Sequence, residues 1–199
     1  ETRSRSGSLK MLLEPTAELE ELDSDDNSDG TLTVFSLKTV TTDNGEFVLT
    51  SFDLDLSGNI NAGSSTIKVH GAVASQTMGV GDVDTNMEIL DGELGRMSAT
   101  GGLTVGSASS GELKVRGVTD GNSGAVATIT LVATKASTKV VFLTTASAFN
   151  KGIVVQAAGG VILSESLTTQ VSQTVISANT GTLTILSGKS LTTSNQLLT

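Results

Sequence analysis

Residues 45–60 read GEFVLTSFDLDLSGNI, a stretch in which apolar and polar side chains alternate. The alternation is clearest in Leu54-Asp55-Leu56. A period of two is the pattern of a half-buried β-strand, because successive side chains of a strand point to opposite faces. The SGN triplet near its end is typical of a turn. The stretch therefore predicts short strands joined by tight turns.

The same alternation recurs in short bursts from Thr31 to the end of the chain. Strand starts are about 8 to 13 residues apart, with Gly, Ser, Asn and Asp between them. No helical periodicity intervenes, so a βαβ sheet is not expected. The bursts are TLTVF (31–35), STIKVHGAV (65–73), GGLTVG (101–106), GELKVRGV (111–118), ATITLVAT (127–134), KVVFLTT (139–145), GIVVQAA (152–158), GVILSESL (160–167), TVISA (174–178) and TLTILSGKSL (182–191).

Two all-β designs suit this pattern, an antiparallel sandwich or barrel and a right-handed parallel β-helix, also called a β-solenoid. The 199 residues include no Trp, no Tyr and only five Phe, whereas a sandwich usually has bulky aromatic anchors. Asn44-Gly45 and Asp120-Gly121 are the clearest candidates for two-residue hairpin turns, and there are few others. In a β-helix, aliphatic side chains stack from coil to coil and small polar residues make the corners. We therefore predict an all-β chain folded as a right-handed parallel β-helix.

The alternation within each burst also predicts which side chains stack in the core. These positions are expected to hold aliphatic residues and to point away from solvent. They are Val34, Leu54, Leu56, Ile67, Val69, Leu103, Val105, Leu113, Val115, Ile129, Leu131, Val141, Ile153, Val155, Ile162, Val175, Leu183 and Ile185.

Residues 31–42 (TLTVFSLKTVTT) return 151 residues later as 182–193 (TLTILSGKSLTT), with seven of twelve letters identical. A glycine precedes each copy, and after a slip of two residues FVLT at 47–50 aligns with QLLT at 196–199. An internal period of this kind is typical of array proteins. We therefore expect one module of about 150 residues and the start of a second copy, followed by sequence that resembles SFDLDLSGNI.

Residues 1–29 differ in composition from the rest. They hold nine of the 21 acidic residues against three bases, which gives the segment a charge of −6 out of a net −9. A short leucine pattern allows an ordered cap, and a solvated acidic arm is the alternative. The predicted division is therefore an acidic N-terminal arm or cap, residues 1–29, and a β-solenoid, residues 30–199.

Residues 91–119, DGELGRMSATGGLTVGSASSGELKVRGVT, resemble a phrase of large β-helix surface proteins. Such phrases recur in filamentous-haemagglutinin-like exoproteins of bacteria and in very long repeat proteins of algae. The resemblance covers residues 45–199 and implies a parallel β-helix in a cell-surface or secreted fibrous protein, with an adhesive or structural role and no active site. The acidic segment departs from the pattern. The matching residues are Glu93, Leu94, Arg96, Met97, Ala99, Leu103, Val105 and Gly106.

Composition excludes several classes of function. Cysteine is absent, which removes disulfides, thiolate catalysis and Cys-ligated metals. The net charge of −9 and the lack of Lys/Arg patches argue against nucleic acid as a partner. No stretch approaches the roughly 20 apolar residues of a membrane span. The lone His70 lies on the strand face opposite Ile67 and Val69, where a solvated surface residue is expected.

Carboxylates are the residues best suited to an enzyme, because many β-helix proteins cleave polysaccharides with paired acids. Asp53 and Asp55 are two apart and share a strand face. The other candidates are Asp82 with Asp84, and the group Glu88, Asp91 and Glu93. The competing interpretation is that these acids form the wet face of strands whose apolar residues point inward.

DDNSDG at 25–30 is the best metal-binding phrase in the chain. Asp25, Asn27 and Asp29, followed by glycine, match the first half of a calcium loop. The bidentate acid expected six residues after that glycine is replaced by Ser36, so the site is weak or completed from elsewhere. Calcium at Asp25, Asn27 and Asp29 is the one cofactor predicted, with a solvated acidic linker as the alternative.

These patterns favour a structural or adhesive β-solenoid module of an extracellular fibre, filament or cell-surface appendage. The expected partners are further copies of the module, other fibre subunits and surface glycans, with no nucleic acid and no membrane span. One alternative is a polysaccharide-cleaving enzyme that uses Asp53, Asp55 or the group from Glu88 to Glu93. The other is a segment of a trimeric phage-type tail fibre, which shares phrases such as GGLTVGS.

Overall fold

The computed structural model describes residues 30–199, and almost all of its regular structure is β-strand. The single α-helix in this part of the chain, α1 (Asp91–Leu94), has four residues. All strand pairs recorded here are parallel. The predicted all-β class is therefore confirmed. Between residues 30 and 199 no helix is long and apolar enough to cross a membrane.

The strands are short, as the spacing of the bursts predicts. Those in the first half are β1 (Thr31–Val34), β2 (Thr39–Thr41), β3 (Phe47–Ser51), β4 (Asp53–Leu56), β5 (Asn59–Asn61), β6 (Thr66–Gly71), β7 (Met78–Gly81), β8 (Met87–Ile89), β9 (Met97–Ser98) and β10 (Gly102–Ser107). Those in the second half are β11 (Leu113–Arg116), β12 (Ile129–Ala133), β13 (Val140–Phe142), β14 (Ser147–Phe149), β15 (Ile153–Ala157), β16 (Val161–Leu163), β17 (Leu167–Thr169), β18 (Val175–Ser177), β19 (Leu183–Ile185) and β20 (Leu191–Thr192).

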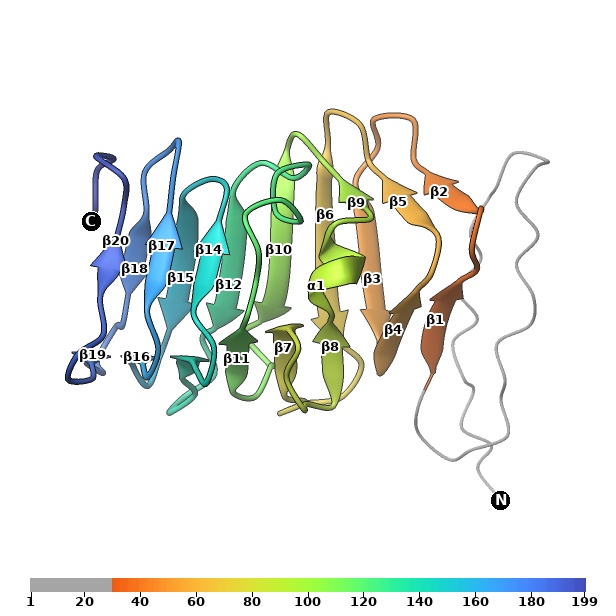
Figure 1. The fold of residues 1–199 in the computed structure, drawn as a ribbon. Coiled ribbons are helices and arrows are strands. Elements are labelled where there is room, and N and C mark those ends of the chain that lie inside the picture. The colour runs from red at the N-terminus through yellow and green to blue at the C-terminus, as the bar shows by residue number, and fades with distance from the viewer. Residues whose placement is uncertain (1–29) are drawn as a thin grey trace, which may run out of the picture.

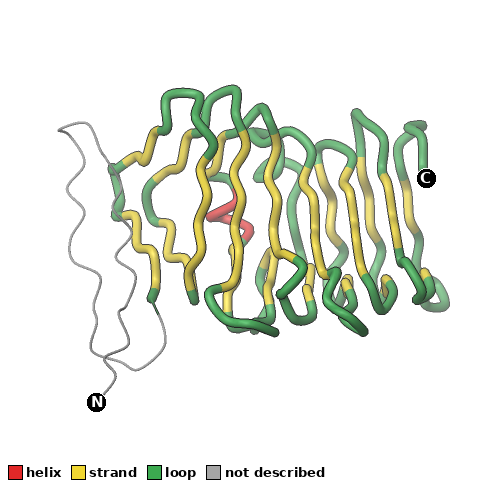
Figure 2. The backbone as a smooth tube through the Cα atoms, turned by 180° about the vertical axis from the view of Figure 1, so that it is seen from behind, coloured by secondary structure: helices red, strands yellow, loops and turns green. Residues whose placement is uncertain are grey.

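The strands form two six-stranded sheets and three smaller ones. The large sheets have the orders β18-β15-β12-β10-β6-β3 and β19-β16-β13-β11-β7-β8, and the small ones are β1-β4, β2-β5-β9 and β14-β17-β20. The chain passes through the sheets one after another and then returns to the first, so that each new strand is added beside the strand from the previous pass (Figures 1 and 2). We call the strands of one pass a layer. The first layer comprises β1, β2 and β3, and the last layer comprises β19 and β20.

Aliphatic side chains of one layer lie in register on those of the next. Leu103 pairs with Ile129, which pairs in turn with Ile153, and each is at most 2% exposed. Burial of such a column removes apolar surface from water and is the main stabilising term of the fold. Most of the predicted inward positions are buried in this way.

Three predicted inward positions are wrong by one residue. Val141 is half-buried, whereas its neighbours Val140 and Phe142 are at most 1% exposed. Ile162 and Val175 are likewise half-buried and point away from the core. Val141 and Ile162 stand in runs that are apolar throughout, so no polar residue marks the outward position and the phase of the alternation is not specified locally. At Val175 the buried Thr174 takes an inward position, so the polar residue there gives the wrong phase.

Two further predicted core residues, Leu183 and Ile185, are each 43% exposed. Their register is that of core residues, because they pair with the buried Val161 and Leu163. They are exposed because β19 is the last strand of its sheet. The alternation predicted the direction of these side chains correctly, but not that one side of their layer is open.

One strand departs from the regular path. After β7 the chain moves toward β4 instead of onward along the stack. There β8 pairs in parallel with the edge of β7 that faces β4. The helix α1 follows directly and contacts β7. The extra strand separates β4 from the sheet that contains β7, so β4 has a hydrogen-bonded neighbour on one edge only, β1.

Candidate functional site

Several of the predicted catalytic acids meet where β8 lies beside β4. The Glu88 N–H donates to Asp53 Oδ1 at 3.4 Å, although the two residues are far apart in sequence. Burial raises the pKa of Glu88, and the negative charges of Asp53 and Glu93 raise it further. The sequence placed Asp53 and Glu88 in separate groups, and the fold brings them into one.

Glu93 binds the chain with both carboxylate oxygens. Its side chain accepts hydrogen bonds from the Leu56 N–H at 2.7 Å and from the Leu90 N–H at 2.9 Å, and the residue is 5% exposed. Arg96 Nη1 donates to the Leu56 carbonyl oxygen and to the Gly92 carbonyl oxygen, each at 3.1 Å. We call this pair of side chains the Glu93–Arg96 clamp. It satisfies the Leu56 peptide groups on the edge of β4 that lacks a strand neighbour.

The clamp gives Glu93 a structural role. A buried carboxylate that already accepts two backbone N–H bonds is not free to exchange protons with a polymer outside. Asp91 is engaged as well, since it accepts bonds from the Thr119 N–H at 2.8 Å and from Asn122 Nδ2 at 2.7 Å. The enzyme hypothesis therefore depends on Asp53, Asp55 and Glu88, and it stays a prediction.

The contacts of Arg96, Thr119 and Asn122 were not predictable from the sequence. A signal for the Leu90 contact existed, because an acid three residues into a helix is the usual partner of the N–H at the helix start. The contact with Leu56 had no local signal, because it joins residues 37 apart.

The acid cluster leads to a prediction for pH. Burial raises the pKa of Glu93 as it does that of Glu88, so the folded chain holds protons that the unfolded chain has released. Stability from these groups is present at low pH and is lost as pH rises through the raised pKa values. We expect the midpoint of thermal unfolding to rise as pH falls from neutral toward the ordinary carboxyl pKa of 4.5. Scanning calorimetry of wild type beside the Glu88→Gln, Glu93→Gln double variant tests this, and an unchanged pH profile in the variant would contradict it.

Asp82 and Asp84 lie near the acid cluster, since their negative charges add to the raised pKa of Glu88. The other predicted site residues lie elsewhere. His70 is half-buried on β6, with Thr50 of β3 beside it. The calcium ligands Asp25, Asn27 and Asp29, like the whole acidic arm or cap of residues 1–29, lie outside the described residues. From residue 30 onward, no group of three or more His, Asp or Glu side chains is arranged to hold a metal ion.

A shallow hollow of about 290 Å³ lies along the β2-β5-β9 sheet. Its polar lining comes from Thr39, Asn59, Asn61, Arg96 and Ser98. Hydroxyl, amide and guanidinium groups all form hydrogen bonds with sugar hydroxyls. The hollow is the surface on which the predicted glycan contact is best tested.

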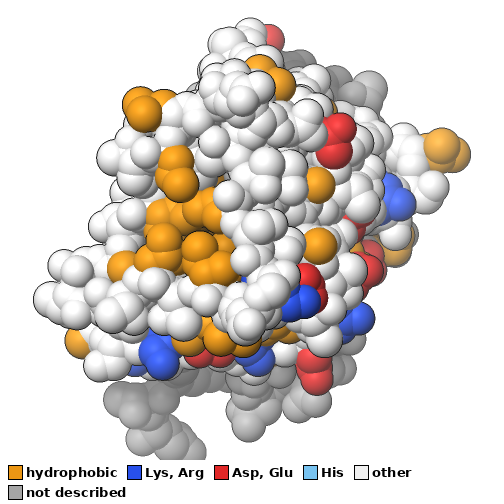
Figure 3. Space-filling view, turned by 60° about the vertical axis from the view of Figure 1, so that its left-hand side comes forward, with side chains coloured by type: hydrophobic (Ala, Val, Ile, Leu, Met, Phe, Trp, Pro, Cys, Tyr) orange, Lys and Arg blue, Asp and Glu red, His pale blue; other side chains and the backbone are white. Residues whose placement is uncertain are grey.

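The last layer stands at the end of the described residues. Its strands β19 and β20 are the last of their sheets, and its residues 197–199 bond to β18 of the layer before. Figure 3, which brings this end forward, shows hydrophobic side chains gathered on it. We call the exposed apolar residues of this end the open-end patch; they are Leu183, Ile185, Leu186, Leu197 and Leu198, with exposed fractions of 43%, 43%, 45%, 63% and 46%. Patches of this kind on soluble proteins mark contact surfaces.

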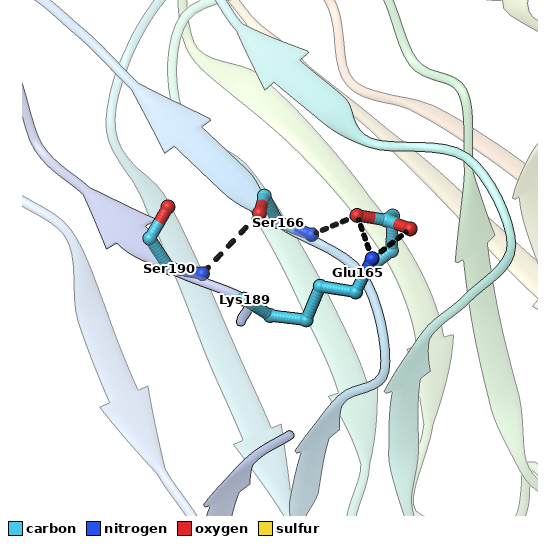
Figure 4. Close-up of polar contacts among 4 residues, drawn as sticks. All are labelled: Glu165, Ser166, Lys189 and Ser190. Carbon is cyan, nitrogen blue, oxygen red and sulfur yellow. Dashed lines mark hydrogen bonds and ion pairs between the residues drawn. The ribbon is translucent and has the colours of Figure 1, made fainter. Parts of the chain in front are cut away.

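The last layer is held firmly on its inner side. Lys189 Nζ lies 2.7 Å from Glu165 Oε2, and this ion pair lowers the pKa of Glu165 (Figure 4). The Ser190 N–H donates to Ser166 Oγ at 3.2 Å, and the Ser166 N–H donates to Glu165 Oε1 at 3.0 Å. These bonds join the last layer to the one before it.

The first and last layers have the same first turn. In the turns 35–38 and 186–189, the N–H of the final lysine donates to the carbonyl of the first residue, at 3.1 and 3.0 Å. Leu37 and Gly188 occupy the same third position, with φ of 66° and 75°. A leucine in this conformation is uncommon. Turns of the same kind also occur at 73–76 and 135–138, where Ser75 and Ser137 have φ of 66°.

The second turns, 42–45 and 193–196, also agree. In each, the last N–H donates to the first carbonyl, at 2.8 and 2.9 Å, and the two central residues have positive φ. The offset is therefore 151 throughout and places Phe47 opposite Leu198. The two-residue slip predicted for this region is wrong, because the turn geometry requires none.

Comparisons of the chain with models of protein families, with curated proteins and with solved structures found no match.

Proposed function

We propose that residues 30–199 form a right-handed parallel β-helix, a β-solenoid, and that it serves as a structural or adhesive module of an extracellular fibre, filament or surface appendage. The parallel register of the layers supports the architecture, because every strand except β8 pairs with a strand of a neighbouring layer. The resemblance of residues 91–119 to surface proteins of this kind supports the location. Further copies of the module are the proposed partners.

The agreement between the two ends of the module carries the proposal. The last layer repeats the first in sequence, in both turns and in the direction of its apolar side chains. Its outer side exposes residues that occupy core positions by register, such as Leu183 and Ile185. A strand edge with an apolar row is a template for a further strand. A further copy of the module would cover both.

We expect purified protein to assemble in a concentration-dependent way, as measured by sedimentation velocity. The Leu183→Asp, Ile185→Asp variant is expected to bind at least about tenfold more weakly, because each side chain is 43% exposed and burial of a fully exposed one is worth about 1.5–3 kcal/mol. Val73→Asp is the control, since this valine is 46% exposed and lies outside both the open-end patch and the first layer. Wild type that stays monomeric throughout, or equal loss in the control, would contradict the proposal.

A further inference from the structure

We propose that residues 9–23 of the acidic segment bind the outer face of the sheet formed by β11, β13 and β16 of the same chain. This face combines outward-facing aliphatic side chains with cations, and the segment combines leucines with carboxylates. The inference goes beyond the proposed function and does not depend on it, because the contact lies within one chain.

One row of outward-facing positions crosses this sheet in register. Glu88 of β8 pairs with Gly79 of β7, and Gly79 pairs with Lys114 of β11. Lys114 pairs with Val141 of β13, which pairs with Ile162 of β16. The character of the row therefore changes along the stack from acidic to basic and then to apolar.

The apolar part of the row lies in the interior of the stack. Val141 and Ile162 are half-buried, and each has a strand neighbour on both sides. Leu143 follows the buried Phe142 and is half-buried too, so it points to the same side as Val141. We call Val141, Leu143 and Ile162 the outer apolar cluster. Contiguous apolar side chains on the outer face of a sheet are a feature of contact surfaces.

Three cations border the outer apolar cluster: Lys114 and Arg116 on β11, and Lys139 directly before β13. None of the three takes part in an ion pair with a residue from 30 to 199. Glu112 stands opposite Lys139 in the same ladder, so the three cations and one acid leave this border a net charge of +2. The alkyl stems of lysine and arginine extend the apolar surface, while their charged ends are left for an anionic partner.

The other large sheet lacks this combination. The lysine of its outward row, Lys68, already lies 2.8 Å from Glu46 Oε1. Its next positions along the stack are hydroxyls instead of a cation beside an apolar cluster. In register, the row runs Val48, Lys68, Thr104, Thr130 and Val154.

The acidic segment carries the complementary side chains. Residues 9–23, LKMLLEPTAELEELD, hold five acids and one lysine, which gives a charge of −4, together with five leucines. The two kinds of residue are interspersed, so leucines placed on the outer apolar cluster bring carboxylates to the bordering cations. Each exposed ion pair is weak by itself, and the apolar contact adds to it.

The chain is long enough for this contact within one molecule. Strands β1, β4, β8, β7, β11 and β13 lie side by side in that order, so β13 is roughly 24 Å from β1. The 16 residues between Leu13 and Gly30 reach about 55 Å when extended. Tethering gives the segment an effective concentration in about the millimolar range, which favours its own chain over another copy.

Paramagnetic relaxation in the full chain tests the contact. The sequence lacks cysteine, so T16C carries a single nitroxide label. We expect the amide signals of β13 and β16 to broaden more strongly than those of β12 and β15, which belong to the other large sheet. Higher ionic strength should reduce the broadening, because salt screens exposed charges. Dilution with unlabelled chain should leave it unchanged.

Charge variants show whether the cations are responsible. Lys114→Glu, Lys139→Glu in the labelled chain should lower the ratio of bound to unbound segment about tenfold, because attraction becomes repulsion at two positions. Lys68→Glu, Lys135→Glu changes the net charge equally at lysines that contact other side chains, and it should retain the broadening.

Val141→Ser, Ile162→Ser tests the apolar part and should also reduce the broadening. Broadening that is unaltered in this variant and in Lys114→Glu, Lys139→Glu overturns the proposal, as does broadening centred on another sheet. Broadening that disappears on dilution with unlabelled chain places the segment on a second copy and overturns the contact within one chain. Circular dichroism of each variant confirms that the chain is folded.

Discussion

Replacement of Phe142 by alanine is expected to lower the free energy of unfolding by about 3–5 kcal/mol. The ring is 1% exposed on β13, and its backbone is paired with Val115 on one side and with Leu163 on the other. Since parallel strands hold both neighbouring layers in place, the space left by the ring cannot close by a simple shift of the backbone. The cost should therefore include most of the cavity term as well as the lost burial.

Phe35→Ala is the matched control, because it removes the same atoms from a side chain that is 50% exposed. Its effect should stay within about 0.5 kcal/mol. Guanidinium unfolding of both variants, followed by far-ultraviolet circular dichroism, measures the difference. Equal losses in the two variants would mean that Phe142 is not part of a packed core.

Replacement of Gly106 by alanine is expected to cost about 2–6 kcal/mol, from backbone strain and steric overlap together. Gly106 has a φ of +91°, which side-chain-bearing residues rarely adopt. An added Cβ would lie 2.1 Å from the carbonyl oxygen of Val132, its partner in the next layer. The obstacle is backbone in a neighbouring strand, so it cannot rotate away.

Gly121→Ala tests whether the position or the residue type matters. No atom lies within 4 Å of a Cβ built at Gly121, so this variant should unfold at nearly the wild-type denaturant concentration. The midpoints of both variants in urea give the comparison. A Gly106→Ala protein as stable as Gly121→Ala would show that β10 and β12 are not stacked as closely as described.

Much of the fold was predictable because the alternation of side chains is a local property. Leu54 and Leu56 flank an aspartate, so the alternation predicts that both leucines face the core. Their burial confirms this. Val141 and Ile162 stand in runs without a polar residue. In such a run the sequence does not show which alternate residues face the core. Packing against the layers on both sides selects the phase there, and that information is not local.

The carboxylate site shows a different limit. That Glu88 and Glu93 lie close together follows from their spacing, but the arrival of Asp53 depends on β8 turning back toward β4. The Glu93–Arg96 clamp exists because that turn leaves Leu56 without a strand neighbour. No residue near Leu56 in the sequence indicates that this strand edge lacks a neighbouring strand. The hydrogen bonds from Leu56 to Glu93 and from Arg96 to Leu56 could therefore not be predicted.

The layered path has a mechanical consequence. Hydrogen bonds between layers run along the stack, so a layer at the end of a stack is bonded on its inner side only. A pull along that direction therefore loads one layer at a time, beginning at the open end, instead of all strands in shear. Val161 pairs with Leu183, 22 residues further along, so each layer that peels away frees about 75 Å of chain. A thread made of such layers would lengthen in steps and absorb work before it breaks.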